Sequence, residues 1–207
     1  MLVEILDADG GMARRPALEE FALKHGIRMG SIEELIRHRL ATEHTVERVD
    51  EREIETAHGP FRLLSYRDRT SRELHFALVR GAPGAQRPAL VRVHVKNALS
   101  DVLHWQRADF GLSVAEAMAR VAEEGEGAVV VLAESPHPDD LLARVTERPE
   151  SARSPAQQWR QNGAGAQILA DLGLRQLRVL GTPRKQVALA GYGLEVVEYV
   201  PGRPSPA

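Results

Sequence analysis

The clearest pattern in the chain is an alternation of apolar and cationic side chains near its middle. Val91, Val93 and Val95 alternate with polar neighbours at every second position. A period of two predicts a β-strand, with the valines on a core face. The opposite face then carries three cationic or titratable side chains, Arg92, His94 and Lys96, and we interpret it as a plausible anion site.

The period changes at Ser113, where a helix is expected to begin. Ser113 followed by Glu116 is a capping-box pattern, and Gly125 marks the end of the helix. Its apolar stripe is Val114, Ala117, Met118 and Val121.

Shorter patterns predict the remaining elements. The run Ala128–Ala133 is continuously apolar, which is typical of a strand covered on both faces. Together the elements predict an α/β (α+β) fold, a mixed sheet with flanking helices. Further strands are expected at 2–6, 53–56, 61–66, 74–79, 177–180 and 194–199, and helices at 16–25, 31–40, 165–172 and 184–190, with one short turn at 139–145.

The polar stretch Ala41–Arg52 contains few large apolar side chains, and we interpret it as a linker. The predicted organisation therefore has three parts: a short N-terminal segment, residues 1–45; a main domain, residues 46–200; and a flexible tail, residues 201–207.

Composition limits the classes of function. The chain has 207 residues, is 43% hydrophobic and carries a formal charge of -2, so it can bury a core but has no global attraction for nucleic acid or anionic membranes. Its apolar runs are strand-sized and the start does not resemble a signal peptide. Because cysteine is absent as well, we expect a cytoplasmic protein.

Residues Arg92–Gly111, the signature segment, resemble the signature of GTP cyclohydrolase II, written approximately R-V-H-S-E-C-x-T-G-D-x-x-x-S-x-R-C-D-C-G. The positions in register are Arg92, Val93, His94, Asp101, Arg107, Asp109 and Gly111. Gly165–Leu174, Arg178–Lys185 and Gly191–Val197 resemble the family's last motifs. The resemblance implies the family's fold and a place in riboflavin biosynthesis, where zinc hydroxide opens the imidazole ring of GTP and formate and pyrophosphate are released.

The family's zinc cysteines correspond to Asn97, Ala108 and Phe110. Catalytic zinc needs soft or borderline ligands and one open position for water. An amide, a methyl group and a phenyl ring cannot supply these ligands, and the chain contains no other thiol. We therefore predict that zinc and the hydrolase activity are lost.

The family's general base is also expected to be missing. Its motif R-Q-E-G-R-G-I-G-L, the following tyrosine and a catalytic D-x-R should fall between Glu134 and Gln161, which contains no tyrosine. Arg160 aligns with the catalytic arginine, but Gln158 stands in place of its acidic companion. Because an amide cannot take a proton as a carboxylate does, we interpret Arg160 as vestigial and name no catalytic residue.

The first forty residues resemble the end of 3,4-dihydroxy-2-butanone 4-phosphate synthase. Val3–Leu6 and Asp7–Arg14 match its V-x-C-E-I and N-D-D-G-x-M-A-R motifs, and Ser31–Ile36 its last helix. The resemblance implies that Glu4 contacts a sugar phosphate, although the rest of that active site has no counterpart. Bifunctional riboflavin proteins fuse these two domains in this order, so we expect residues 1–45 to be the end of a magnesium-dependent synthase domain.

Each remaining candidate has a structural alternative. Arg92 and His94 mark either a vestigial phosphate or purine pocket or an ordinary solvent-facing strand, and we favour the strand. Lys185 falls on a family lysine that meets the nucleotide, next to the cationic Arg184 at a helix start, and could bind an anion.

A structural role is also an alternative for the other charged and aromatic candidates. Asp101, Arg107 and Asp109 are either remnants of a nucleotide site or a structural ion-pair group, which we favour. Single histidines are expected at the surface or as caps, the arginines from Arg144 to Arg160 in a solvated mobile loop, and Trp105 and Trp159 as packing anchors.

Three functions follow as hypotheses. The main domain is an inactive scaffold or regulator of a synthase; or it is an active GTP cyclohydrolase with another metal or none; or it is a sensor of purine or flavin nucleotides. We expect a homodimer, weak binding of GTP or another phosphate ligand at most, and neither nucleic acid nor membrane as a partner.

Overall fold

The structure is a computed structural model that describes residues 3–7, 9–31, 34–35, 38, 43–107, 109–134, 138–146, 155–183 and 189–202, without the side chains of 155–160 and 190. Two compact units divide the chain, residues 1–39 and residues 40–207. Among the described residues, no helix is both long enough and apolar enough to cross a bilayer.

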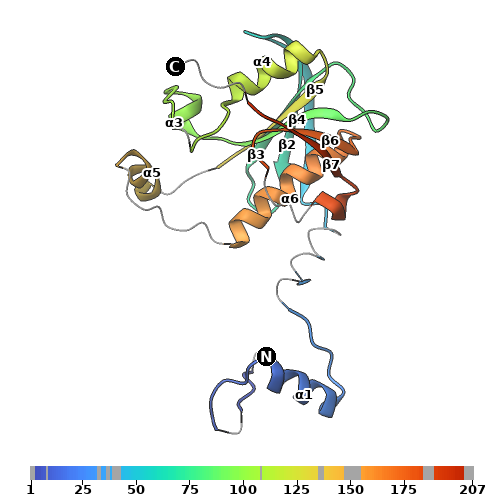
Figure 1. Cartoon of the computed structure of the whole chain (residues 1–207), viewed down its shortest axis with the longest axis vertical. Helices are drawn as coiled ribbons and strands as arrows, with labels where there is room; N and C mark the ends of the chain where they lie inside the picture. The colour runs from blue at the N-terminus through green and yellow to red at the C-terminus, as the bar shows by residue number, and fades with distance from the viewer. Residues whose placement is uncertain are drawn as a thin grey trace. The chain divides into compact units, whose positions relative to one another are not determined.

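The first unit contains helix α1, Arg15–His25 (Figure 1). Proline stands in its first turn, and Gly26 ends it in the left-handed conformation with φ 64°, as the sequence predicts. The capping box at Ser31 is also confirmed, since Ser31 Oγ accepts from Glu34 N and Ser31 N donates to Glu34 Oε2. The described residues of the expected helix at 31–40 are Ser31, Glu34, Leu35 and His38, the last three of them helical.

The strand predicted at 2–6 is wrong for the residues described. Only one bridge forms, between Leu6 and Met12, where the chain reverses through the turn at Asp7–Gly11. Ala13 N also donates to Ile5 O, but no ladder of strand pairs is described for Val3–Ile5 in this unit.

The second unit is built on a seven-stranded mixed sheet (Figure 1), which confirms the predicted fold class. Its strands lie in the order β1-β2-β3-β5-β4-β6-β7; β1 to β3 and β5 pair antiparallel, whereas β5, β4, β6 and β7 pair parallel. The strands are β1 Val46–Thr56, β2 Gly59–Asp68, β3 Leu74–Arg80, β4 Ala89–Val95, β5 Gly127–Leu132, β6 Gln176–Leu180 and β7 Glu195–Val200.

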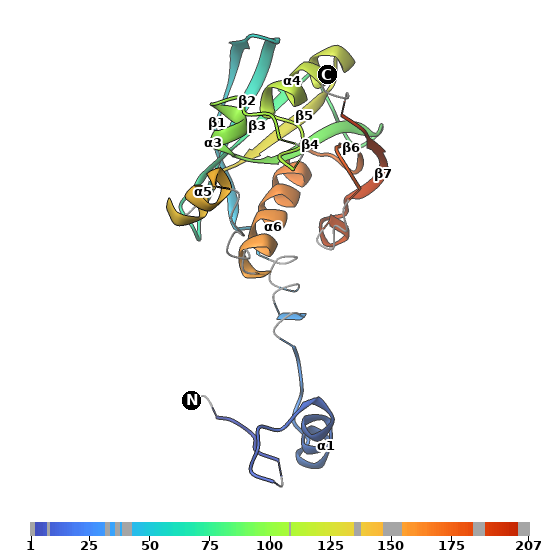
Figure 2. The same cartoon turned by 60° about the vertical axis from the view of Figure 1, so that its left-hand side comes forward.

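Helices cover both faces of this sheet. Helix α4, Val114–Glu124, packs on one face and helix α6, Pro155–Asp171, on the other, as Figure 2 shows from a second direction. Two apolar clusters result: Val91, Val130 and Ile168 belong to the α6 side, and Leu90, Val129 and Val121 to the α4 side. The other described helices are α3 Ala98–Asp101, α5 Pro138–Val145 and the 3-10 turn η1 Leu189–Tyr192.

The predicted linker is wrong from Val46 onward, because β1 begins there and runs to Thr56. β1 is an edge strand with mostly exposed side chains, so a charged sequence is tolerated and protects the edge from pairing with other chains. A register shift between Arg48 and Asp50 also breaks the alternation by which a strand is recognised.

Helix α6 is longer than predicted. The sequence analysis predicts a helix only at 165–172, whereas α6 begins at Pro155 and continues through Gly163 and Gly165. Gly165 has another role: a Cβ there would lie 2.9 Å from Val93 Cγ1, so glycine lets the helix approach β4 closely. Gly165 is therefore required for the packing of α6 against β4 and does not mark the start of the helix.

Candidate functional site

The signature segment lies at the carboxyl ends of two parallel neighbours, β4 and β5. The chain leaves β4 toward α4 on one face and leaves β5 toward α6 on the other. Such a divergence opens the crevice in which α/β sheets usually place their ligands. The fold therefore positions residues after Val95 and after Leu132 where a site is expected.

His94 is buried, with 4% of its surface exposed, so the predicted solvent-facing strand is wrong at this position. β4 is a central strand and α4 covers the face that carries His94, which a single alternating pattern does not reveal. The His94 Nε2 lies 2.8 Å from Asp101 Oδ2, and the same oxygen accepts a hydrogen bond from Asn97 N. His94 and Asp101 thus hold the start of the signature loop against β4.

Arg92 is half-buried on the same face and binds backbone carbonyls. Its Nη1 donates to Leu180 O at 3.0 Å and its Nη2 to Leu112 O at 3.3 Å. Gly181 leaves the space for this, since a Cβ there would lie 2.7 Å from Arg92 Nη1. Arg92 therefore joins β4, the end of β6 and the approach to α4, whereas Lys96 is exposed.

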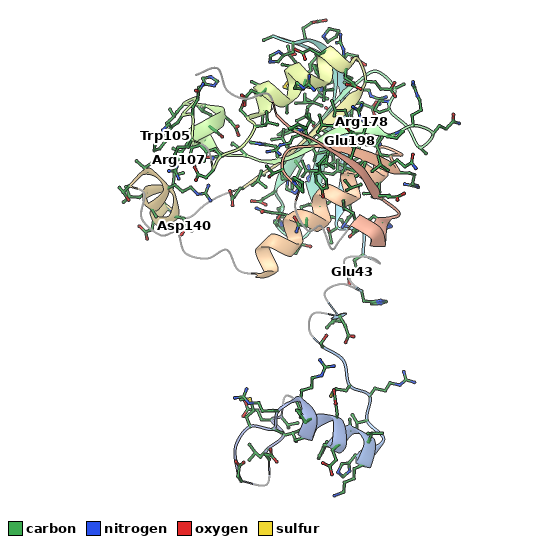
Figure 3. All side chains as sticks on the ribbon, viewed as in Figure 1. Glu43, Trp105, Arg107, Asp140, Arg178 and Glu198 are labelled. Carbon is green, nitrogen blue, oxygen red and sulfur yellow. The ribbon has the colours of Figure 1, made fainter. Side chains whose placement is uncertain are left out.

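Arg107 connects the other end of the signature segment to α5. It donates from Nε and Nη2 to the two Asp109 carboxylate oxygens, at 2.9 and 2.6 Å, and from Nη1 to Arg144 O at 2.7 Å. The hydrogen bonds from Arg107 lower the pKa of Asp109 below its usual value. Figure 3 shows Arg107 beside Trp105, and the guanidinium carbon lies 5.3 Å from the centroid of the Trp105 ring.

Arg144 also corrects a prediction, because it does not solvate a loop. It is 7% exposed, belongs to α5 and lies 3.8 Å from Glu134 Oε2 through Nη1. Together with Arg107 it fixes α5 near the signature segment. Arg92, Arg107 and Arg144 are thus each engaged with protein groups.

The residues at the family's cysteine positions do not fit zinc. Asn97 Oδ1 accepts from Leu99 N at 3.1 Å and caps α3, and Phe110 packs edge-to-face on Trp105 with ring centroids 5.9 Å apart. Ala108 lies outside the described residues. Within the described ranges, no group of three or more histidine, aspartate or glutamate side chains could hold a metal ion.

The structure does not bring all sequence candidates together. Glu4 is exposed in the first unit. Lys185, most of the helix expected at 184–190, and the side chains of Trp159 and Arg160 lie outside what the structure describes. An open hollow of about 260 Å³ contains no residue of the signature segment; it is lined by Glu53, Pro60, Arg62, Val79, Arg80 and Gly81.

The burial of two polar residues was not predicted from the sequence. His75 is 4% exposed, and its Nδ1 accepts from Ala133 N. Gln167 is 5% exposed; its Oε1 accepts from Thr45 N and Val46 N, and its Nε2 donates to Tyr192 Oη. The only signal for either was a polar residue within an apolar segment.

The fold and this site define a class: an α/β domain with a strand, loop and helix signature at the ends of parallel strands. The sequence profile of GTP cyclohydrolase II matches residues 47–201, and the chain belongs to this family.

Relatives share both units of the chain. A 3,4-dihydroxy-2-butanone 4-phosphate synthase of Pseudomonas syringae pv. tomato is 48% identical over 97% of this chain and 56% of its own length. The riboflavin biosynthesis protein RibBA of Chlorobium phaeovibrioides is 36% identical over 97% of this chain and 52% of its own.

A solved structure is similar as well. The crystal structure of RibBX, a two-domain 3,4-dihydroxy-2-butanone 4-phosphate synthase from A. baumannii, matches 94% of this chain and 52% of its own with 36% identity and a TM-score of 0.65. The chain thus spans about half the length of the relatives it matches.

Proposed function

We propose that this chain serves riboflavin biosynthesis as part of a synthase-type protein, in which residues 46–200 are a GTP cyclohydrolase II-family domain that does not hydrolyse GTP. The domain acts as a scaffold or regulator for a domain that makes 3,4-dihydroxy-2-butanone 4-phosphate. The names of the relatives support the pathway. The synthase chemistry and its magnesium would belong to that other domain.

One observation carries the proposed inactivity: the signature segment uses its polar groups to hold itself together. Asn97 caps a helix, Asp101 accepts from Asn97 N and contacts His94, and Arg107 binds Asp109 and a carbonyl of α5. A zinc-dependent hydrolase needs free ligands and an open position at this place. The same contacts disfavour a cyclohydrolase that uses another metal, because Arg92 and His94 are already engaged.

The test is a GTP assay on the purified chain with zinc, magnesium or manganese. We expect no formate and no pyrophosphate above a heat-killed control, while a cysteine-containing family member produces both under the same conditions. Product formation that depends on time and enzyme concentration would overturn the proposal.

Calorimetry separates the scaffold from a nucleotide sensor. A scaffold should give no binding heat with GTP, GMP or FMN at ligand concentrations up to the millimolar range. Saturable heat with any of the three would replace the scaffold by a sensor, without restoring the hydrolase.

A further inference from the structure

The open hollow beside β2 and β3 lies away from the signature segment. Arg80, which lines the hollow, pairs with Gly127, the first residue of β5, and Gly127 pairs in turn with Leu90 near the start of β4. The chain enters the signature loop at the opposite, carboxyl end of β4. The hollow is therefore a separate feature of the sheet, and its chemistry does not depend on the proposed function.

The lining of the hollow contains side chains of both charges. Arg62 and Arg80 supply two guanidinium groups, and Glu53 supplies a carboxylate. Arg80 Nη1 donates to the carbonyl of Pro60, another lining residue, so this guanidinium lies at the wall of the hollow. An arginine has five N–H donors, and this is the one hydrogen bond that Arg80 makes to the described part of the chain. Donors of Arg80 therefore remain for a ligand.

Arg62 and Glu53 stand directly opposite each other on β2 and β1 but do not form an ion pair. Arg62 Nη1 lies 3.4 Å from Glu51 Oε1 instead, and Arg62 Nε is buried without a hydrogen-bond partner. Glu53 is exposed and has no partner among the described residues. Opposite charges that face each other across two strands usually attract. The unmade pair leaves a donor and an acceptor that a ligand could join.

We propose that the hollow binds a small α-amino acid as its zwitterion. The carboxylate of the ligand lies against Arg62 and Arg80, because a guanidinium presents its N–H donors in a fork that fits a carboxylate. The ammonium group lies against Glu53. A ligand with an anion alone would be repelled by Glu53 and Glu51, and one with a cation alone by the two arginines.

The size of the hollow limits the side chain of this amino acid. The volume of about 260 Å³ is below the range of roughly 300–1,000 Å³ that holds drug-sized ligands. Pro60 gives the hollow an apolar wall. We therefore expect a short side chain, and the main-chain groups of the amino acid supply most of the recognition.

An NMR titration of the isotope-labelled full chain tests the proposal with three probes. L-Alanine carries both charges, whereas propionate carries only the carboxylate and alaninamide only the ammonium group. The amide signals of Arg62 and Gly81 should shift saturably with L-alanine, with a Kd of about 1 mM or below. The other two probes should bind at least about 10-fold more weakly, because each leaves one charge of the lining unmatched.

Variants assign the binding to the hollow. Glu53→Gln and Arg62→Gln should each weaken the binding of L-alanine by about 10-fold or more, as expected for the loss of one hydrogen bond between charged groups. The matched control is Arg67→Gln, the same replacement at an exposed position of the same strand outside the hollow. This control should bind L-alanine as wild type does. The amide spectrum shows whether each variant is folded, and Glu53→Gln changes only an exposed side chain of an edge strand.

Three results would overturn the proposal: no saturable shift with L-alanine, equal binding of all three probes, or full binding by Glu53→Gln and Arg62→Gln. The GTP assay does not involve the hollow. Failure of amino acid binding is therefore distinguishable from failure of the proposed function.

Discussion

Two buried histidines show what single residues contribute to this fold. His94 finds a carboxylate partner, Asp101, whereas His75 accepts a backbone hydrogen bond through Nδ1. An unmet polar group in the interior costs more than a hydrogen bond gains, so each partner is needed. The two residues therefore depend on different kinds of partner.

His75 should make stability depend on pH. Burial lowers the pKa of His75, and the charges of Asp68 and Glu73 only partly oppose this effect. The unfolded chain then takes up a proton near pH 6.5 and the folded chain only at a lower pH, so stability is complete above pH 6.5 and falls as the pH drops below it.

Urea unfolding at pH 7.5 and 5.5 measures this loss. Wild type should lose more stability than His75→Gln over this range, by at most about 1.4 kcal/mol, the free energy that corresponds to one pKa unit. Replacement of the exposed His44 by glutamine should leave the wild-type dependence in place. Equal pH dependence of wild type and His75→Gln would contradict the assignment.

Asp101 should matter more for stability than Asp109, although both are acidic residues of the family signature. Asp101→Ala leaves the 4% exposed His94 and the Asn97 N–H without their acceptor, at a cost of about 2–3 kcal/mol. Asp109 forms an exposed pair with Arg107, and its replacement by alanine should cost less than about 1 kcal/mol. Chemical denaturation compares the two variants, and a reversed order would show that the buried contact is unimportant.

At the level of elements, sequence patterns located α1, α4, β3, β4 and β5 well, because each has a cap, a regular apolar period or an unbroken apolar run. The sequence patterns failed where a contact between residues distant in sequence determines the secondary structure. The charged β1 is a strand because it pairs with β2, and α6 continues through two glycines because it lies close to β4. No local pattern contains this information.

The start of β1 depends on Gln167, which lies more than a hundred residues away in sequence. Gln167→Leu removes the acceptor of Thr45 N and Val46 N, and should destabilise the domain by about 2–4 kcal/mol. Hydrogen exchange should become faster at the beginning of β1 in this variant, and the increase in rate should be larger there than in β4. Gln106→Leu, on an exposed residue, is the control with the same substitution. An equal increase in the exchange rate over all strands would indicate general destabilisation, and not the loss of the hydrogen bonds that hold the start of β1.

For the whole molecule, the sequence predicted the family, because the family is recognisable from the residue types of the signature segment. The sequence did not predict the contacts that hold this segment. These are pairwise contacts, His94 with Asp101 and Arg107 with Asp109 and α5, and they exist only after β4, β5 and α5 have been brought together.

The thermal stability of a domain held by these contacts should not depend on metal ions. A metal that binds the folded state at 100 times its dissociation constant stabilises it by about 2.7 kcal/mol, which would shift the thermal midpoint of a domain of this size by several degrees. We therefore expect the midpoint measured by differential scanning calorimetry to change by less than about 1 °C when EDTA or zinc is added. A family member that keeps the cysteines should lose stability with EDTA in the same experiment, because its loop is closed by the metal. A clear fall in the midpoint of the wild-type chain with EDTA would mean that a metal contributes to its fold, and that the contacts of Asp101 and Arg107 are not sufficient to hold the signature segment.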